Sequence, residues 1–322
     1  MVRVSAGTDH RQRTPEEGDR RMTQTNSIAT QPGKQRSGRD RPLPRVGLAL
    51  SGGGARGLAH IGVLKVLERA AVPIDMLSGT SMGGVVAAAY ASGLSPEAME
   101  QEAIRMASPR RLLSLADPTL PHRGLFEGQK IRDYLTDHLG ECTFEDLRCP
   151  LTLVAVNLRD SQAVRLNEGR VTDAVRATIA LPGIFRPVER DEQLLVDGGL
   201  LDNLPADVAR QMGADMVIAV DVVSGGDTFS SMLETLRGRR YIPNGLVSTF
   251  EVMLRSLDVM MKEINERRLI EAEPEVIIRP NIPSGVSVLV GFSRAADAIA
   301  AGERAASEAL GEIEEQLARL GV

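Results

Sequence analysis

The chain contains 322 residues with a formal net charge of −5 and 43% hydrophobic residues, enough for one large globular domain or two small ones. Its two cysteines, Cys142 and Cys149, are too few for a disulfide framework or a cysteine-based metal site. The lack of tryptophan and the 3% aromatic content argue against a surface that stacks on nucleic-acid bases.

Residues 1–42 differ in composition from the rest of the chain. They are rich in arginine, glutamine, threonine and glycine and carry a net charge of about +4, which leaves about −9 for residues 43–322. This composition predicts a disordered arm, and it lacks the apolar segment of a signal peptide. We expect residues 43–322 to form one domain, with a motif-bearing part at 45–222 and a helical part at 223–322.

No apolar stretch of the chain approaches eighteen residues without a charge. We therefore expect no membrane-spanning helix and a cytoplasmic protein. Its contact with lipid would then be peripheral, at the inner membrane face.

The first predicted strand, Val46 to Leu50, leads into the glycine-rich segment Ser51 to Gly57. A helix is predicted to follow from Leu58 to Arg69, where apolar residues recur at helical spacing. A strand, a glycine-rich turn and a helix in this order are compatible with two kinds of binding site.

Gly52, Gly54 and Gly57 fit the G-x-G-x-x-G pattern of a dinucleotide site, with a pyrophosphate at the helix N-terminus. Alternatively, the backbone N–H groups of Gly52, Gly53 and Gly54 form an oxyanion hole. A dinucleotide site needs an acidic residue at the end of the second strand, whereas Asp75 begins the next apolar run. The oxyanion hole is therefore favoured.

The pentapeptide Gly79-Thr80-Ser81-Met82-Gly83 matches G-x-S-x-G. It lies between a short apolar run, Ile74 to Leu77, and a helix-like run of small residues, Val85 to Ala91. A sharp turn from strand to helix would expose the serine oxygen at a helix N-terminus, where the backbone dipole favours negative charge. The pattern predicts Ser81 as a nucleophile.

Asp197 follows the apolar run Leu194 to Val196 and precedes Gly198 and Gly199. A carboxylate at a strand end beside two glycines is suited to a loop that faces the same site as Ser81. Asp-Gly is also a common turn signal, and this dipeptide alone favours an ordinary turn.

Strands and helices alternate after the serine motif, which predicts a mainly parallel sheet covered by helices on both faces. The further strands are expected near Leu151 to Val156, Val164 to Leu166, Leu194 to Val196, Met216 to Val222 and Val276 to Arg279. Ligands bind such sheets at the carboxyl ends of the strands, where Ser81 and Asp197 are both expected.

Two long helices are predicted in the C-terminal third, from Gly245 to Arg268 and from Phe292 to Leu320. The first is methionine-rich and either packs on the core or forms a wall of an acyl-chain pocket. The segment Arg110 to Gly124 is either a flap near the site or an ordinary connecting loop.

Taken together, these motifs resemble those of the patatin-like phospholipases, in particular their compact bacterial members. The resemblance runs from about Arg45 to about Val222. Its blocks are the glycine-rich loop Gly52 to Gly57, the serine motif Gly79 to Gly83, the alanine-rich segment Ala177 to Phe185, the aspartate motif Asp197 to Gly199 and, in the bacterial variety, Gly124 to Ile131. It implies a three-layer α/β/α fold.

The resemblance implies a Ser–Asp dyad, and the histidines allow an independent check. The four histidines are His10, His60, His122 and His138, and none follows Asp197, so the usual order Ser…Asp…His is impossible. His60, close to the glycine loop, is interpreted as a packed or hydrogen-bonded helix residue.

The resemblance therefore implies a serine hydrolase of lipid esters, of the phospholipase A or lysophospholipase kind, that uses no metal and no cofactor. Asp197 would activate Ser81, and Gly52, Gly53 and Gly54 would form the oxyanion hole. Arg56 either binds an anionic head group, supports the loop, or faces solvent at the start of the helix. The partner is then a lipid ester at a membrane surface, and no nucleic acid is expected. The alternative is a weakly active or inactive member that acts through protein contacts.

Overall fold

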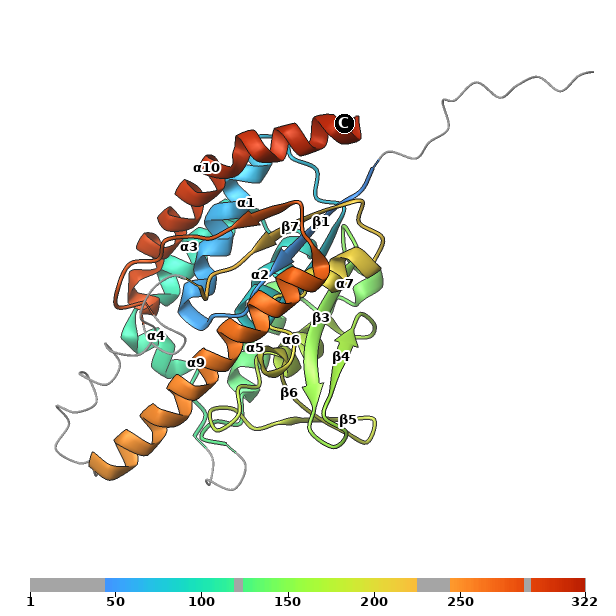
Figure 1. The fold of residues 1–322 in the computed structure, drawn as a ribbon. Coiled ribbons are helices and arrows are strands. Elements are labelled where there is room, and N and C mark those ends of the chain that lie inside the picture. The colour runs from blue at the N-terminus through green and yellow to red at the C-terminus, as the bar shows by residue number, and fades with distance from the viewer. Residues whose placement is uncertain (1–43, 119–123, 225–243, 287–290, 322) are drawn as a thin grey trace, which may run out of the picture. The chain divides into compact units, whose positions relative to one another are not determined.

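The structure of the protein is a computed structural model that describes residues 44–118, 124–224, 244–286 and 291–321 (Figure 1). The predicted arm at residues 1–42 lies outside these ranges. Its disorder and the domain boundaries at 42 and 222 therefore stay predictions.

Within the described residues, eight strands form one sheet in the order β5-β6-β3-β2-β1-β7-β8, with β4 paired to β3. The pairs β1–β2, β1–β7, β2–β3 and β7–β8 are parallel, and β3–β4, β3–β6 and β5–β6 are antiparallel. The strands are β1 (Val46–Leu50), β2 (Met76–Thr80), β3 (Leu151–Asn157), β4 (Gln162–Leu166), β5 (Val188–Arg190), β6 (Gln193–Asp197), β7 (Met216–Val220) and β8 (Val276–Ile278). This confirms a mainly parallel sheet.

Two of the predicted strands run in the opposite direction to the rest. The expected strands at 164–166 and 194–196 are present as β4 and β6, but each pairs antiparallel with β3. β5 was not predicted. It forms a hairpin with β6 through Asp191 and Glu192, both with positive φ, as a two-residue type I′ turn requires.

The helices cover both faces of the sheet. They are α1 (Ala59–Arg69), α2 (Ser81–Ala91), α3 (Pro96–Met106), α4 (Pro109–Ser114), α5 (Gln129–Leu139), α6 (Val171–Thr178), α7 (Ala206–Gln211), α9 (Asn244–Ala272) and α10 (Ala295–Leu320). Short 3₁₀ helices are η1 (Gly54–Leu58), η2 (Phe144–Asp146), η3 (Gly198–Leu200) and η4 (Phe292–Arg294). The segment expected to be a flap or a loop contains part of α4, and its residues 119–123 lie outside the described ranges.

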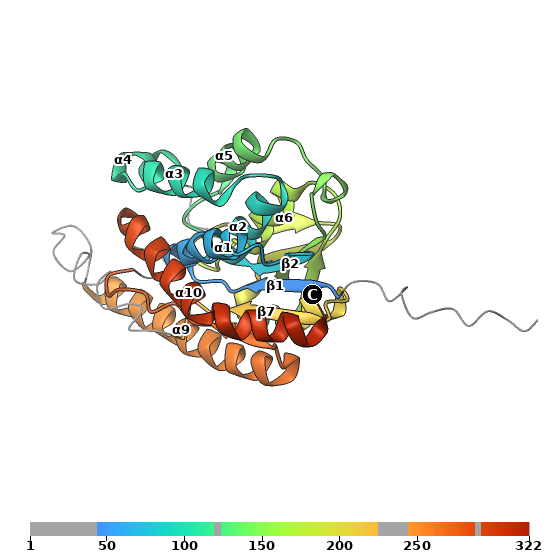
Figure 2. The same ribbon diagram turned by 90° about the horizontal axis from the view of Figure 1, so that it is seen from above.

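Side chains that alternate along β1 separate the two cores. Leu48 and Leu50 pack with α1, α2 and α10, whereas Ala49 packs with Val217, α7 and the C-terminal end of α9. Figure 2 shows α1 and α2 on one side of the sheet and α9 on the other. The three-layer α/β/α arrangement expected from the sequence is confirmed.

The contact between α1 and α10 depends on two glycines. A Cβ at Gly62 would lie 2.0 Å from the Ile299 carbonyl oxygen, and one at Gly302 would lie 1.9 Å from the Ala59 carbonyl oxygen. Backbone atoms cannot move away as a flexible side chain can, so any larger residue separates the helices. Because α1 follows the glycine-rich loop directly, this contact also fixes the position of that loop.

We expect Gly302→Ala to lower the free energy of unfolding by about 1–3 kcal/mol, the range of an overpacked core. Gly311, on the same helix, provides the control, since no atom lies within 4 Å of its Cβ position. Gly311→Ala should raise the stability by about 0.5–1 kcal/mol through helix propensity. Urea unfolding of both variants measures the difference, and equal stabilities would contradict the backbone contact.

Candidate active site

Strand β2 turns sharply into α2 at Ser81, whose backbone φ is +52°. A left-handed φ is strained for a residue with a side chain and persists only where neighbours fix the backbone. Here the Ser81 N–H donates to Thr178 Oγ1 at 2.9 Å, and the Thr178 hydroxyl donates to the Val154 carbonyl. A Cβ at Gly83 would lie 2.3 Å from the Leu50 carbonyl oxygen. The turn therefore depends on glycine and leaves Ser81 at the N-terminus of α2.

The Ser81 hydroxyl donates to Asp197 Oδ2 at 2.7 Å, and the Gly199 N–H donates to Asp197 Oδ1 at 2.8 Å. Asp197 is only 4% exposed. Burial raises the pKa of its carboxyl from 3.8 to about 6, although both hydrogen bonds act in the opposite direction. At neutral pH the carboxylate is therefore still ionised and is a stronger base than an exposed aspartate.

The sheet brings Ser81 and Asp197 together by an arrangement of three strands. Parallel strand β2 pairs with β3 up to Thr80 opposite Val154, and antiparallel strand β6 pairs with β3 up to Asp197 opposite Ala155. The carboxyl ends of β2 and β6 thus meet at consecutive positions of β3. Residues 116 positions apart in the sequence become hydrogen-bond partners without any connecting side chain.

The glycine-rich loop lies directly beside Ser81. A Cβ at Gly52 would lie 3.1 Å from the Ser81 Cβ. The Gly52 N–H already donates to the Asn203 carbonyl at 2.9 Å, so it has an acceptor within the protein. The N–H groups of Gly53 and Gly54 have no acceptor among the described residues. Of the three predicted oxyanion donors, Gly53 and Gly54 are the two whose N–H groups are available.

Arg56 is buried, with 1% of its surface exposed. Its guanidinium donates to the carbonyls of Val223 at 3.0 Å and Val286 at 3.3 Å. The expectation of a solvent-facing residue at the helix start is therefore wrong, and these contacts favour support of the loop over binding of a head group. A buried guanidinium satisfies loop carbonyls that would otherwise lack donors.

His60 lies on α1 with no exposed surface, and its Nε2 is 2.8 Å from the Ser51 carbonyl oxygen. Burial lowers the pKa of its imidazole to about 4, so the ring is neutral at pH 7. It contacts the glycine-rich loop, because the Nε2 hydrogen bond goes to that loop and not to Ser81 or Asp197. This agrees with a hydrogen-bonded helix residue.

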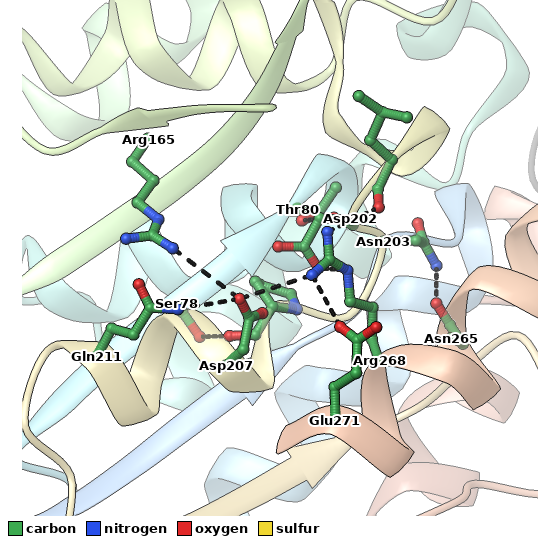
Figure 3. A network of polar contacts seen from close by, with 12 residues as sticks. Ser78, Thr80, Arg165, Asp202, Asn203, Asp207, Gln211, Asn265, Arg268 and Glu271 are labelled. Atoms are coloured by element: carbon green, nitrogen blue, oxygen red, sulfur yellow. Dashed lines mark hydrogen bonds and ion pairs between the residues drawn. The ribbon is translucent and has the colours of Figure 1, made fainter. Parts of the chain in front are cut away.

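The segment after Asp197 lies against β2. The Ser78 hydroxyl donates to the Pro205 carbonyl at 2.7 Å, and the Thr80 hydroxyl donates to the Asp202 carbonyl at 2.8 Å (Figure 3). Both donors are on the strand that ends at Ser81. The strand before Ser81 and the segment after Asp197, here called the aspartate loop, are therefore held together by these two hydrogen bonds.

A pair of carboxyl groups connects this segment to α9. Asp202 is buried, and its pKa is raised, first by burial and then by the neighbouring Asp207 carboxyl group. The Arg268 guanidinium of α9 lies 3.9 Å from Asp202 and 3.8 Å from Asp207, and Arg165 lies 3.9 Å from Asp207 (Figure 3). The two arginines partly compensate the paired acids.

The sequence did not predict that α9 would contribute polar residues next to the site. Met261, Asn265 and Arg268 follow one another at helical spacing and all contact or approach residues 199–207. An asparagine within an otherwise apolar helical stripe was the available signal, because a buried amide needs hydrogen-bond partners. Asn203 offers no such signal, because it lies in a loop, where polar residues are common.

Across the described ranges, no group of three or more histidine, cysteine, aspartate or glutamate side chains is arranged to hold a metal ion. Cys142 and Cys149 are free. In the same part of the chain, no helix combines the length and apolar character needed to cross a bilayer.

Residues 48–210 match the family model described as patatin-like phospholipase. An uncharacterized NTE family protein of Mycobacterium tuberculosis is 36% identical over 280 residues, which are 82% of this chain and 46% of that protein. A second protein of that description and organism is 40% identical over 179 residues, 56% of this chain and 49% of its own length. The chain thus spans about half the length of these curated relatives.

The mouse patatin-like phospholipase domain-containing protein 6 is 39% identical over 189 residues, 57% of this chain but 14% of its own length. Among solved structures, VipD of Legionella pneumophila aligns with a TM-score of 0.47 and 13% identity over 85% of this chain and 67% of VipD. The matched region contains the glycine-rich loop, Ser81 and Asp197. The chain belongs to the patatin-like phospholipase family.

Proposed function

We propose that the protein is a metal-independent serine acyl hydrolase that cleaves carboxylic esters of lipids, of the phospholipase A or lysophospholipase type. The observation that carries the proposal is the 2.7 Å hydrogen bond from Ser81 Oγ to the buried Asp197 carboxylate. The adjacent glycine-rich loop offers N–H groups where an oxyanion would form. Family membership supports a lipid substrate.

In the first half of the reaction, Ser81 Oγ attacks the ester carbonyl while Asp197 takes the hydroxyl proton. The negative charge that develops on the carbonyl oxygen is stabilised by the N–H groups of Gly53 and Gly54, an effect worth about 3–4 kcal/mol per donor in comparable sites. Asp197 then returns the proton to the departing alcohol oxygen as the carbon–oxygen bond breaks. An acyl-serine remains.

In the second half, water attacks the acyl-serine carbonyl and Asp197 accepts its proton. The same N–H groups stabilise the second oxyanion, and Ser81 recovers its proton when the fatty acid leaves. A carboxyl pKa of about 6 suits both directions of proton transfer, because the group remains ionised at neutral pH and is basic enough to share a proton.

The alternative function is a protein-interaction module with little or no activity. It does not require a strained serine, a buried aspartate and free loop N–H groups in one place. A strained backbone at Ser81 and a desolvated Asp197 both destabilise the fold and are typical of sites selected for chemistry.

The first test is covalent labelling by a fluorophosphonate probe, followed by intact-mass measurement and peptide mapping. We expect labelling confined to Ser81 and hydrolysis of p-nitrophenyl esters that Ser81→Ala abolishes. Asp197→Asn should lower kcat/KM by about 10³-fold or more, as loss of a catalytic carboxylate does in serine hydrolases. A folded wild-type protein that is neither labelled nor active would favour the interaction module.

His60→Ala is the matched control for this series, because His60 contacts the glycine-rich loop but not the dyad. We expect it to retain more than about a tenth of the activity, since it only removes a support of the Ser51 carbonyl. A His60 variant as inactive as Ser81→Ala would contradict the dyad, and so would a fully active Asp197→Asn.

The pH dependence follows from the raised pKa of Asp197. Protonated Asp197 cannot accept the serine proton, so kcat/KM should be constant near pH 7–8 and fall about tenfold per pH unit below about 6. A profile of kcat/KM against pH, measured between pH 4.5 and 8.5, tests this. An acid limb near pH 4, the range of an exposed aspartate, would contradict the desolvated carboxylate.

The same burial predicts that the catalytic aspartate reduces stability. The pKa of Asp197 is about 6 in the folded chain and about 3.8 when unfolded, so its favourable contribution is complete below 3.8 and is lost as pH rises through 6. At pH 8 the free energy of unfolding of Asp197→Asn should therefore exceed that of wild type by on the order of 3 kcal/mol, and its Tm should be higher. At pH 4 the gain should vanish, and an equal gain at both pH values would refute this origin.

A further inference from the structure

Helix α9 contacts the aspartate loop along one face. The Met261 sulfur lies 3.3 Å from the position that a Cβ on Gly199 would take, and Arg268 Nη2 donates to the Leu201 carbonyl at 3.4 Å. Between them, Asn265 accepts a hydrogen bond from Asn203 Nδ2 at 3.1 Å (Figure 3). One helical stripe therefore follows the loop that carries the catalytic aspartate, and its central contact is polar.

The Asn265 amide is fixed by Asp221 at the end of β7. Asp221 Oδ1 accepts hydrogen bonds from Asn265 Nδ2 at 2.9 Å and from the Val223 N–H at 3.0 Å. Its Oδ2 accepts one from the Ser224 hydroxyl and lies 3.7 Å from the Arg279 guanidinium. Both oxygens of Asp221 therefore face donor groups and act as acceptors.

An acceptor at one end determines the orientation of both amides. Asn265 must direct its NH₂ group toward Asp221 and therefore presents its carbonyl oxygen to Asn203. Asn203 must in turn direct its NH₂ group toward Asn265, which leaves its Oδ1 on the opposite side. All three side chains are at most 1% exposed, so water does not compete for these bonds.

Asn203 lies between the two loops of the proposed active site. Its main-chain carbonyl accepts the Gly52 N–H, and its Oδ1 is 2.3 Å from the Cβ position of Gly52 and 2.9 Å from that of Gly199. A reversed amide would place an NH₂ group, with its hydrogens, against the same two backbones. The orientation of Asn203 thus fixes the spacing between the glycine-rich loop and the loop that follows Asp197.

We propose that Asn265 is a positioning residue for the glycine-rich loop, acting through Asn203 and oriented by Asp221. The inference rests on the proposed function, because the loop positioned in this way is the one that offers the Gly53 and Gly54 N–H groups. Asn265 itself does not touch substrate. Its loss should move the oxyanion donors and leave the hydrogen bond between Ser81 and Asp197 intact.

Three variants separate positioning from stability. Asn265→Leu removes both hydrogen bonds at similar volume. Asn265→Asp keeps an acceptor for Asn203 but buries a second carboxylate beside Asp221, which destabilises the fold. Leu269→Ala, one turn along α9, removes a buried apolar side chain that has no part in the amide chain. Each is assayed for kcat and KM with a p-nitrophenyl ester, for the rate of fluorophosphonate labelling, and for Tm.

We expect Asn265→Leu to lower kcat and the labelling rate by about 10–100-fold with KM within about twofold, as displaced oxyanion donors would. Asn265→Asp should have the lower Tm of the two Asn265 variants and yet the higher kcat. Leu269→Ala should have a lower Tm than wild type, whereas its kcat should stay within about threefold of the wild-type value. A kcat that follows Tm across the three variants overturns the proposal, and so does an Asn265→Leu variant with wild-type kcat.

Amide hydrogen exchange provides a readout that does not depend on activity. The Gly52 N–H, which donates to Asn203, should exchange at least about tenfold faster in Asn265→Leu and at the wild-type rate in Leu269→Ala. Unchanged exchange in Asn265→Leu overturns the connection between α9 and the loop. A folded wild-type protein that the probe does not label refutes the proposed hydrolase instead, and the exchange rates still decide whether Asn265 holds the loop.

Discussion

The meeting of two strand ends along β3 is the constraint on which the rest of the site depends. Strand β2 arrives parallel to β3 and β6 arrives antiparallel, and they stop at the consecutive positions Val154 and Ala155. If Asp197 ended a strand parallel to β2, its carboxyl end would be separated from that of β2 by at least one strand spacing, about 4.8 Å. The opposed strands place Ser81 and Asp197 in direct hydrogen-bond contact, with no histidine between them.

This contact has an energetic consequence that links chemistry to stability. Asp197 is basic because it is buried, and the same desolvation disfavours its ionised form in the folded chain. The strained φ of Ser81 adds a second unfavourable term at the adjacent residue. Bonds farther out compensate, including those from Ser78 and Thr80 to the aspartate loop. The glycine contact between α1 and α10 belongs to the same support, since α1 follows the glycine-rich loop.

Much of this arrangement could be predicted from local sequence, because the serine turn, the glycine-rich loop and the aspartate turn each have a short pattern with a steric reason. The order of elements also predicted a mainly parallel three-layer sheet. What could not be predicted depends on long-range pairing. Strand direction for β6 follows from its hairpin with β5, and the burial of Arg56 follows from carbonyls more than 160 residues away. Asn265 becomes informative only when α9 lies against Asn203.

The pairing of β6 with β3, after the two-residue turn at Asp191 and Glu192, fixes which face of the sheet each β6 side chain occupies. Side chains alternate between the faces of a sheet, so a shift of β6 by one residue against β3 would turn the residue at the Asp197 position to the opposite face. Insertions within the turn leave the strand phase unchanged, whereas a single insertion within β6 exchanges the two faces. Among diverged or recombined sequences of this fold, length changes in β6 should therefore survive in even steps, and single-residue changes should be confined to the turn that precedes it.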